Sequence, residues 1–139
     1  MPINTHSINP LHTQCVACGS TAQQASSLAL RFKPEGEASV VGHFEVGLNH
    51  QGYNGLLHGG LICTLLDASM THCLFRHKVT ALTAELSTRF IKPIKVGQQL
   101  LITARLLSHR RGIYKLEAHI THDLEVVARA EAKFVASEF

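Results

Sequence analysis

A chain of 139 residues, of which 45% are hydrophobic and 17% are charged, suits one compact domain with a single core. The formal net charge is only +3 and no run of Lys or Arg exceeds two residues, so the sequence does not support a nucleic-acid partner. The first twelve residues lack a basic start and an apolar core, and no stretch is apolar enough for a membrane span, so we expect a cytoplasmic protein.

Residues 1–27 show little periodicity, which indicates an irregular N-terminal arm before a single domain spanning 28–139. Within the arm, His12, Cys15 and Cys18 have the spacing of half a zinc site. A structural zinc site has four ligands, and no second pair of Cys or His follows at a suitable spacing. We therefore expect a tight turn with reduced thiols and no bound metal, with zinc as the alternative.

Two short alternating runs follow the arm. Leu28, Leu30 and Phe32 form the first, and a turn at 34–36 separates it from the second. The second run has apolar residues at alternate positions: Ala38, Val40, Gly42, Phe44 and Val46. This pattern predicts a hairpin, and the Gly- and Asn-rich residues 47–57 predict a loop after it.

The stretch from Asn54 to Lys78 is the only long segment with helical periodicity. Its apolar residues cover most of the helix circumference, so the helix should be buried. One polar stripe remains, because Thr64, Asp67 and Thr71 fall at positions i, i+3 and i+7. This stripe either faces solvent or marks a functional site, since a carboxylate beside a desolvated surface must be paired or used.

The start of this helix carries the triplet His58-Gly59-Gly60. Two glycines leave the backbone N–H groups uncovered at the positive end of the helix dipole, where they can bind an anion or a developing oxyanion. Alternatively, they only permit close packing against a strand. A carboxylate together with an exposed helix N-terminus is a plausible arrangement for acyl transfer.

Four longer alternating runs follow the helix. Their expected inward residues are Leu82, Ala84, Leu86 and Phe90; Leu100, Ile102, Ala104 and Leu106; Tyr114, Leu116, Ala118 and Ile120; and Val126, Ala128, Ala130, Ala132 and Phe134. Arg110-Arg111-Gly112 predicts a hairpin turn, and a loop around Asp123 leads into the last run. The order of elements predicts an α+β architecture with a curved antiparallel sheet wrapped around one long central helix.

This order of elements resembles the hotdog fold, and two stretches resemble the PaaI-like acyl-CoA thioesterases. The first is Asn54-Gly55-Leu56-Leu57-His58-Gly59-Gly60, with Asp67 nine residues after the His, and the second is the strand from Thr83 to Gly97. The early Cys-x-x-Cys-Gly resembles one branch of the family. The resemblance implies hydrolysis of an acyl-CoA to a free acid and CoA, without a metal or organic cofactor.

The resemblance also implies roles for individual residues. Gly59 would polarise the thioester carbonyl through its N–H, Asp67 would act as nucleophile or general base, and Thr83 would help to orient water. His58 would shape the loop, and Thr71 matches a hydroxyl position of related enzymes. Candidate substrate-binding residues are Asn54, Gly60 and Thr64, with Arg89, Lys92, Arg110 and Arg111 for the CoA phosphates, although the basic residues could equally form a solvated face. Some relatives have Asn or Gln where this chain has Gly52, and Gln51 or Asn54 would have to substitute.

Two alternatives from other classes remain. A hotdog hydratase or dehydratase would use a carboxylate and a histidine, and Asp67 with His72 is a weak match to that pair. A non-catalytic acyl-CoA-binding protein is the other.

The spacing of the proposed catalytic groups predicts an assembly. Gly59 and Asp67 are 67 − 59 = 8 residues apart, which is roughly 12 Å along a straight helix. An oxyanion donor and an attacking group must both lie about 3 Å from the reacting carbonyl. We therefore expect a homodimer, which could pair further into a dimer of dimers, with each site built from two chains.

Overall fold

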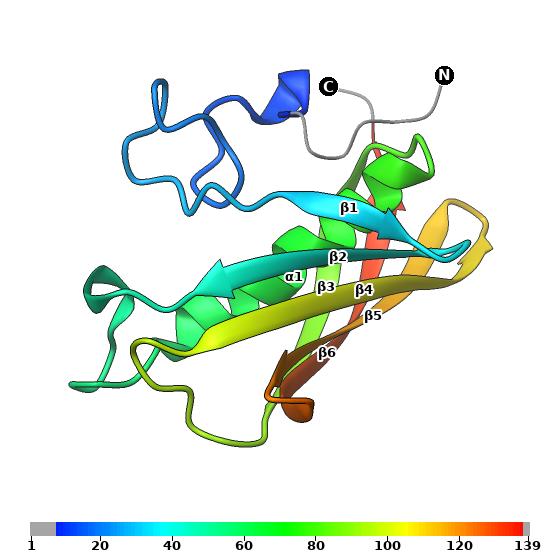
Figure 1. The fold of residues 1–139 in the computed structure, drawn as a ribbon. Coiled ribbons are helices and arrows are strands. Elements are labelled where there is room, and N and C mark those ends of the chain that lie inside the picture. Colours follow the sequence, from blue (N-terminus) through cyan, green and yellow to red (C-terminus); the bar gives the residue numbers. More distant parts are fainter. Residues whose placement is uncertain (1–7, 138–139) are drawn as a thin grey trace.

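The computed structural model describes residues 8–137, which form one six-stranded antiparallel sheet curved around one long helix (Figure 1). Helix α1 spans Gly59–Arg76. The strands are β1 (Phe32–Glu35), β2 (Ser39–Glu45), β3 (Ala81–Phe90), β4 (Gln99–Arg110), β5 (Ile113–His122) and β6 (Glu125–Ala136), in the sheet order β1-β2-β4-β5-β6-β3. The predicted hotdog architecture is confirmed. The first seven residues of the predicted arm and the last two of the predicted domain lie outside the described residues.

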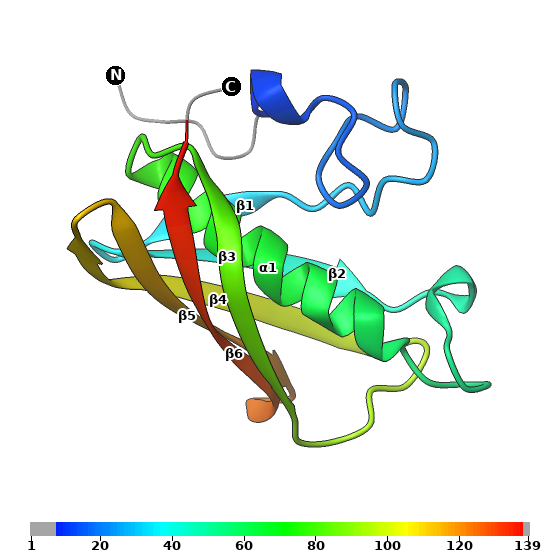
Figure 2. The same ribbon diagram turned by 180° about the vertical axis from the view of Figure 1, so that it is seen from behind.

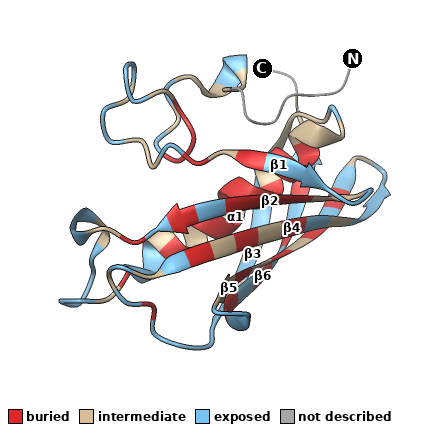
Figure 3. Ribbon diagram, viewed as in Figure 1, coloured by how far each residue is buried: buried red, intermediate tan, exposed pale blue. Residues whose placement is uncertain are grey.

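Helix α1 lies across one face of the sheet and contacts every strand (Figure 2). Figure 3 shows buried residues along α1 and along the strands that surround it. The small side chains Ala128, Ala130 and Ala132 on β6 are buried, as the sequence predicted, and leave room for the helix. Within residues 8–137, no helix is long and apolar enough to cross a membrane.

Helix α1 begins at Gly59 rather than at Asn54, in agreement with the predicted loop at residues 47–57. Gly55 has a φ of +83°, and His58 has extended backbone angles of −61° and 132°, so residues 54–58 belong to the loop. At the other end, Arg76 donates hydrogen bonds to the carbonyl oxygens of Glu35, Gly36 and Ser39. These bonds tie the end of the helix to the β1–β2 hairpin.

The first predicted strand was placed too early. Leu28 and Leu30 donate backbone hydrogen bonds to Val16 and Ala17 in the N-terminal arm, and β1 begins only at Phe32. The backbone N–H groups of Leu28 and Leu30 are thus bonded to the arm, and the hairpin turn follows β1 at 36–38 instead of 34–36. The two later hairpins agree with the prediction, since positive φ values at Arg111-Gly112 and Asp123-Leu124 form two-residue turns.

Two β-bulges overturn part of the predicted inward pattern. The pairing of β3 with β6 shifts between Thr83 and Glu85, so Ala84 is an extra residue and the side chains before and after it change faces. Leu82 is therefore 56% exposed, and Thr83 turns toward the helix. A shift between β5 and β6 likewise buries Val127 in place of Val126.

Candidate active site

Asp67 is half-buried on α1 and is held by a neighbouring strand. The Thr83 hydroxyl on β3 donates a hydrogen bond of 2.6 Å to Asp67 Oδ1. The bulge at Ala84 is the reason that Thr83 faces the helix together with Leu86, which packs on the same core. The sequence predicted both residues, and the structure brings them together.

A cavity of about 370 Å³ opens beside Asp67. Its walls come from α1, from β3 and from the N-terminal arm. The lining residues are His12, Cys15, Val16, Ala17, Cys18, Cys63, Thr64, Asp67, Ala68, Thr71, His72 and Leu86. Asp67 is the only carboxylate among them, and the volume lies within the range of small-molecule sites, roughly 300–1,000 Å³.

The other two residues of the polar stripe also reach this cavity. The Thr64 hydroxyl donates to the Gly60 carbonyl oxygen at 3.0 Å, and the Thr71 hydroxyl donates to the Asp67 carbonyl oxygen at 3.1 Å. Both hydroxyls thus donate their only proton to a carbonyl oxygen in the preceding turn of their own helix. Only their oxygen lone pairs remain to accept a hydrogen bond from a ligand.

Sequence reasoning missed the contribution of the N-terminal arm. It placed the turn with His12, Cys15 and Cys18 outside the site, whereas the structure packs this turn onto the cavity wall. Burial lowers the pKa of His12 from its usual value, against a smaller opposing effect of Asp67, and burial raises the pKa of the Cys18 thiol to about 12. The Cys-x-x-Cys-Gly pattern was the available signal, but nothing in it showed where the turn would pack.

His72 is buried in the same wall, and its burial limits its chemistry. Burial, with smaller effects of His12 and Arg31, lowers the pKa of His72 to about 4, so the imidazole is neutral near pH 7. Its Nε2 has no hydrogen-bond partner within residues 8–137. Asp67 and His72 also point roughly 140° apart around the helix. This geometry disfavours an acid–base pair of the dehydratase type.

Among the described residues, the N-terminus of α1 has one backbone N–H group without a hydrogen-bond partner. His58 Nδ1 accepts a hydrogen bond of 2.8 Å from the Gly60 N–H, and the His58 carbonyl oxygen accepts from Leu61 and Ile62. The Gly59 N–H donates to no group in the described part of the chain. The predicted loop role of His58 is thus that of a helix cap, and the cap occupies the Gly60 N–H while leaving the Gly59 N–H available.

Gly59 and Asp67 do not meet within one chain. The helix between them is continuous, so they are separated by roughly 12 Å along its axis. Gly59 lines a different hollow, of about 350 Å³, formed with Gly52, Tyr53 and neighbouring loop residues. One subunit therefore presents the Gly59 N–H and the Asp67 carboxylate at two separate places.

The loop before the helix contains the two side-chain amides, Gln51 and Asn54, that were considered as partners of the substrate carbonyl. Gln51 Oε1 accepts from the Gly55 N–H at 2.6 Å, and Gln51 Nε2 donates to the Leu48 carbonyl oxygen at 2.7 Å. The side chain of Gln51 is thus committed to holding the loop. Asn54 is exposed near the loop tip, so it is the better candidate of the two.

The basic residues predicted to bind phosphates do not gather within one chain. Arg89 lies near the C-terminal end of β3 and Lys92 follows the strand, where it forms an ion pair with Glu125. Arg110 and Arg111 lie at the β4–β5 hairpin, which the strand register aligns with the start of β3. The two groups are roughly 23 Å apart along the sheet, so a single phosphate cannot contact both groups of one subunit.

Residues 54–130 match the family model of the thioesterase superfamily. The acyl-coenzyme A thioesterase THEM4 of Rattus norvegicus is 32% identical over 106 residues, which cover 75% of this chain and 46% of the rat protein. The chain therefore spans less than half the length of that relative.

Two solved structures resemble the fold closely. A crystal structure of a thioesterase superfamily protein has a TM-score of 0.80 and 26% identity, covering 86% of this chain and 62% of its own. The protein smu.793 of Streptococcus mutans UA159, solved bound to acetyl CoA, has a TM-score of 0.72 and 26% identity, with 78% and 88% covered.

Proposed function

The chain belongs to the thioesterase superfamily, and we propose that it hydrolyses an acyl-CoA thioester to a free acid and CoA. The observation that carries this proposal is the Asp67 carboxylate, which accepts a hydrogen bond from Thr83 and lines a largely apolar cavity. The name of the rat relative and the acetyl CoA bound to the streptococcal protein support an acyl-CoA as substrate.

The cavity, Asp67 and Gly59 would each have a separate role in the reaction. The acyl chain would occupy the cavity, and its carbonyl carbon would face Asp67. Asp67 would then activate a water molecule as general base or attack the carbonyl itself as nucleophile. The negative charge that develops on the carbonyl oxygen would be stabilised by the free Gly59 N–H at the positive end of α1.

A complete site requires a second subunit, and the sheet offers a surface for it. Strand β3 lies at one edge of the sheet, is ten residues long and is exposed along most of its length. A long exposed edge strand presents unpaired backbone groups that another chain can pair with. We infer a homodimer in which the β3 strands of two copies pair antiparallel around a two-fold axis.

This pairing would bring the two catalytic groups together. Asp67 bonds to Thr83, whereas the space next to Gly59 is bounded by the Phe90 ring, whose nearest atom lies 3.7 Å from where a Cβ would be. If the axis passes midway between Thr83 and Phe90, Phe90 of one chain lies opposite Thr83 of the other. Gly59 of one subunit then approaches Asp67 of its partner, with adjacent strands about 4.8 Å apart. The same pairing would bring the basic residues at the two ends of β3 closer together across subunits.

The decisive experiment measures thiol release from a panel of short-chain, long-chain and aryl acyl-CoAs. We expect turnover with at least one class and no hydration of an enoyl-CoA. Hydration without thiol release would support the dehydratase alternative. Saturable acyl-CoA binding without any turnover would support a binding protein.

The hydrogen bond from Thr83 yields a separate prediction. Thr83→Val removes a bond to a carboxylate, which contributes about 1.5–3 kcal/mol, and should lower kcat/KM roughly 10- to 100-fold. Thr83→Ser keeps the hydroxyl and should retain most of the activity. Steady-state kinetics would measure both.

Thr88→Val is the matched control, because Thr88 lies on the same strand and its hydroxyl contacts Cys63 rather than Asp67. Equal losses in the Thr83 and Thr88 variants would contradict a specific role for Thr83.

A further inference from the structure

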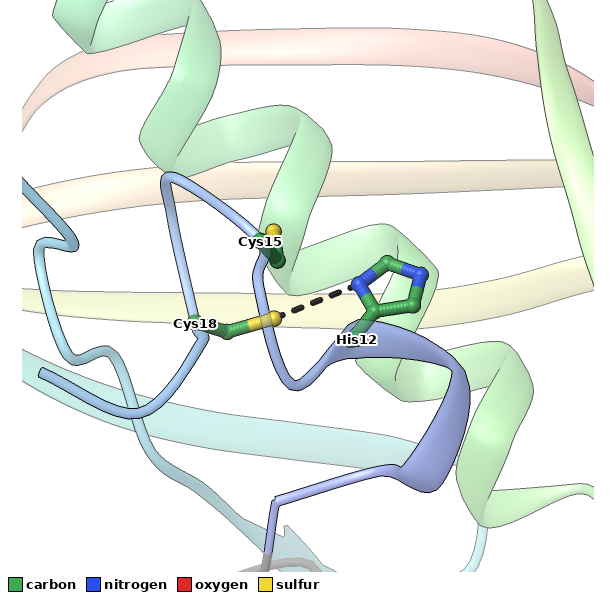
Figure 4. Close-up of side chains that lie close together, drawn as sticks. All are labelled: His12, Cys15 and Cys18. Atoms are coloured by element: carbon green, nitrogen blue, oxygen red, sulfur yellow. Dashed lines mark hydrogen bonds between the residues drawn. The ribbon is translucent and has the colours of Figure 1, made fainter. Parts of the chain in front are cut away.

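Three potential metal ligands lie close together in the N-terminal arm. Figure 4 shows the Cys18 sulfur directed toward the His12 ring, with the Cys15 side chain close beside them. Cys18 Sγ lies 3.4 Å from His12 Nδ1, and the three ligand atoms all lie within 4.8 Å of one another. Around a tetrahedral zinc ion, Zn–S bonds of about 2.3 Å and Zn–N bonds of about 2.0–2.1 Å place ligand atoms roughly 3.6–3.8 Å apart. Small side-chain shifts would therefore suffice to close the three atoms around an ion.

The turn that carries the two cysteines is rigidly built. The Gly19 N–H donates to the Cys15 carbonyl oxygen at 2.8 Å, and a Cβ at Gly19 would lie only 2.6 Å from that oxygen. Only glycine therefore fits this tight turn. The Arg31 guanidinium bonds the Cys18 carbonyl oxygen at 2.9 Å and fixes the far side. A ligand set held in place before binding loses little conformational freedom when an ion arrives.

The backbone also fixes the position of one sulfur. The Ala17 N–H donates to Cys15 Sγ at 3.3 Å, so the sulfur is held inside the turn. Cys15 and Cys18 are free thiols in the structure, and Cys18 is 2% exposed.

We propose that His12, Cys15 and Cys18 bind one Zn²⁺ through three protein ligands, with a water molecule from the adjacent cavity in the fourth position. Two thiolates and one imidazole favour zinc over magnesium or calcium. The sequence predicted no metal because it lacks the four ligands of a closed structural site. The structure instead brings three ligands together, which suits a site with one open position. All three ligands line the same cavity as Asp67.

The ion would fix one wall of that cavity. The His12 ring packs edge-on against Phe75 of α1, with ring centroids 5.1 Å apart. A metal that joins His12 to the Cys15–Cys18 turn would therefore tie the arm more firmly to the helix. The chemistry proposed for Asp67 does not pass through the ion, so zinc binding and thioester hydrolysis can be tested separately.

The test measures metal content and ligand type in the 139-residue chain. Protein purified under reducing conditions is stripped with a chelator and reloaded with Zn²⁺, and in a parallel sample with Co²⁺. We expect about one zinc per chain, and thiolate-to-cobalt charge-transfer absorption in the cobalt sample. His12→Ala, Cys15→Ser and Cys18→Ser should each weaken zinc binding by more than the roughly 10- to 100-fold that loss of an outer-shell partner costs.

Cys63→Ser is the matched control, because Cys63 lines the same cavity but its thiol contacts Thr88. This variant should bind zinc as the unmodified chain does. Zinc should raise the melting temperature of the unmodified chain but not that of Cys18→Ser. Well below one zinc per chain after reloading, full zinc binding in Cys18→Ser, or a Cys15–Cys18 disulfide that persists under reducing conditions would overturn the proposal.

Discussion

Asp67→Asn should lower the turnover number by on the order of 10²-fold or more, because an amide can act neither as general base nor as nucleophile. The substitution keeps the shape of the side chain, and the amide oxygen can still accept the hydrogen bond that Thr83 donates to Oδ1. The fold should therefore survive, as circular dichroism and urea unfolding would show. Thiol release from the best acyl-CoA substrate measures the loss.

The chain contains one other aspartate, which provides the control. Asp123 lies in the β5–β6 turn with a φ of +49°, a conformation that Asn adopts as readily as Asp. Asp123→Asn should therefore leave both stability and turnover almost unchanged. A folded Asp67→Asn protein, free of contaminating hydrolase, that retained normal turnover would exclude Asp67 as the catalytic group.

The features that the sequence predicted well depend on local patterns. The spacing of Thr64, Asp67 and Thr71 placed them on one helix face, and all three line the cavity. The His58-Gly59-Gly60 triplet predicted uncovered N–H groups at the helix start. This holds for Gly59, whose N–H makes no hydrogen bond in the described residues, but not for Gly60, whose N–H donates to His58 Nδ1. Helical spacing and glycine chemistry act over a few residues, so they can be read without knowledge of the tertiary structure.

The features that the sequence did not predict depend on distant partners. The bulges at Ala84 and Val127 come from strand registers that are set across the sheet, and no local pattern marks them. A simple alternating pattern would point Thr83 away from the helix. The bulge at Ala84 instead turns Thr83 toward Asp67. The packing of Cys15 and Cys18 onto the cavity likewise depends on where the arm folds back.

A mixed dimer should recover activity that neither parent has. If each site joins Gly59 of one subunit to Asp67 of the other, a heterodimer of an Asp67→Asn chain and a Gly59→Pro chain contains one intact site and one doubly damaged site. Its activity per dimer should be about half that of the unmodified protein, whereas each parent lacks an essential group in both sites and should be inactive.

Gly59→Pro is a clean substitution for this test. Gly59 is the first helical residue, where proline is tolerated, and its N–H makes no hydrogen bond within residues 8–137. The preceding His58 already has a ψ of 132°, the extended conformation that proline requires before it. A Cβ at position 59 would meet only the Phe90 ring at 3.7 Å, an ordinary contact. The proline thus removes the oxyanion donor and leaves the helix in place.

The control for the mixing experiment pairs Asp67→Asn with a chain that carries both substitutions. No arrangement of these two chains contains an intact site, so any activity that appears must come from contamination. Verified heterodimers of the single variants that remain inactive would show that Gly59 and Asp67 do not share a site across subunits. Full activity in a monomer would contradict the dimer, because about 12 Å of continuous helix separates the two groups within one chain.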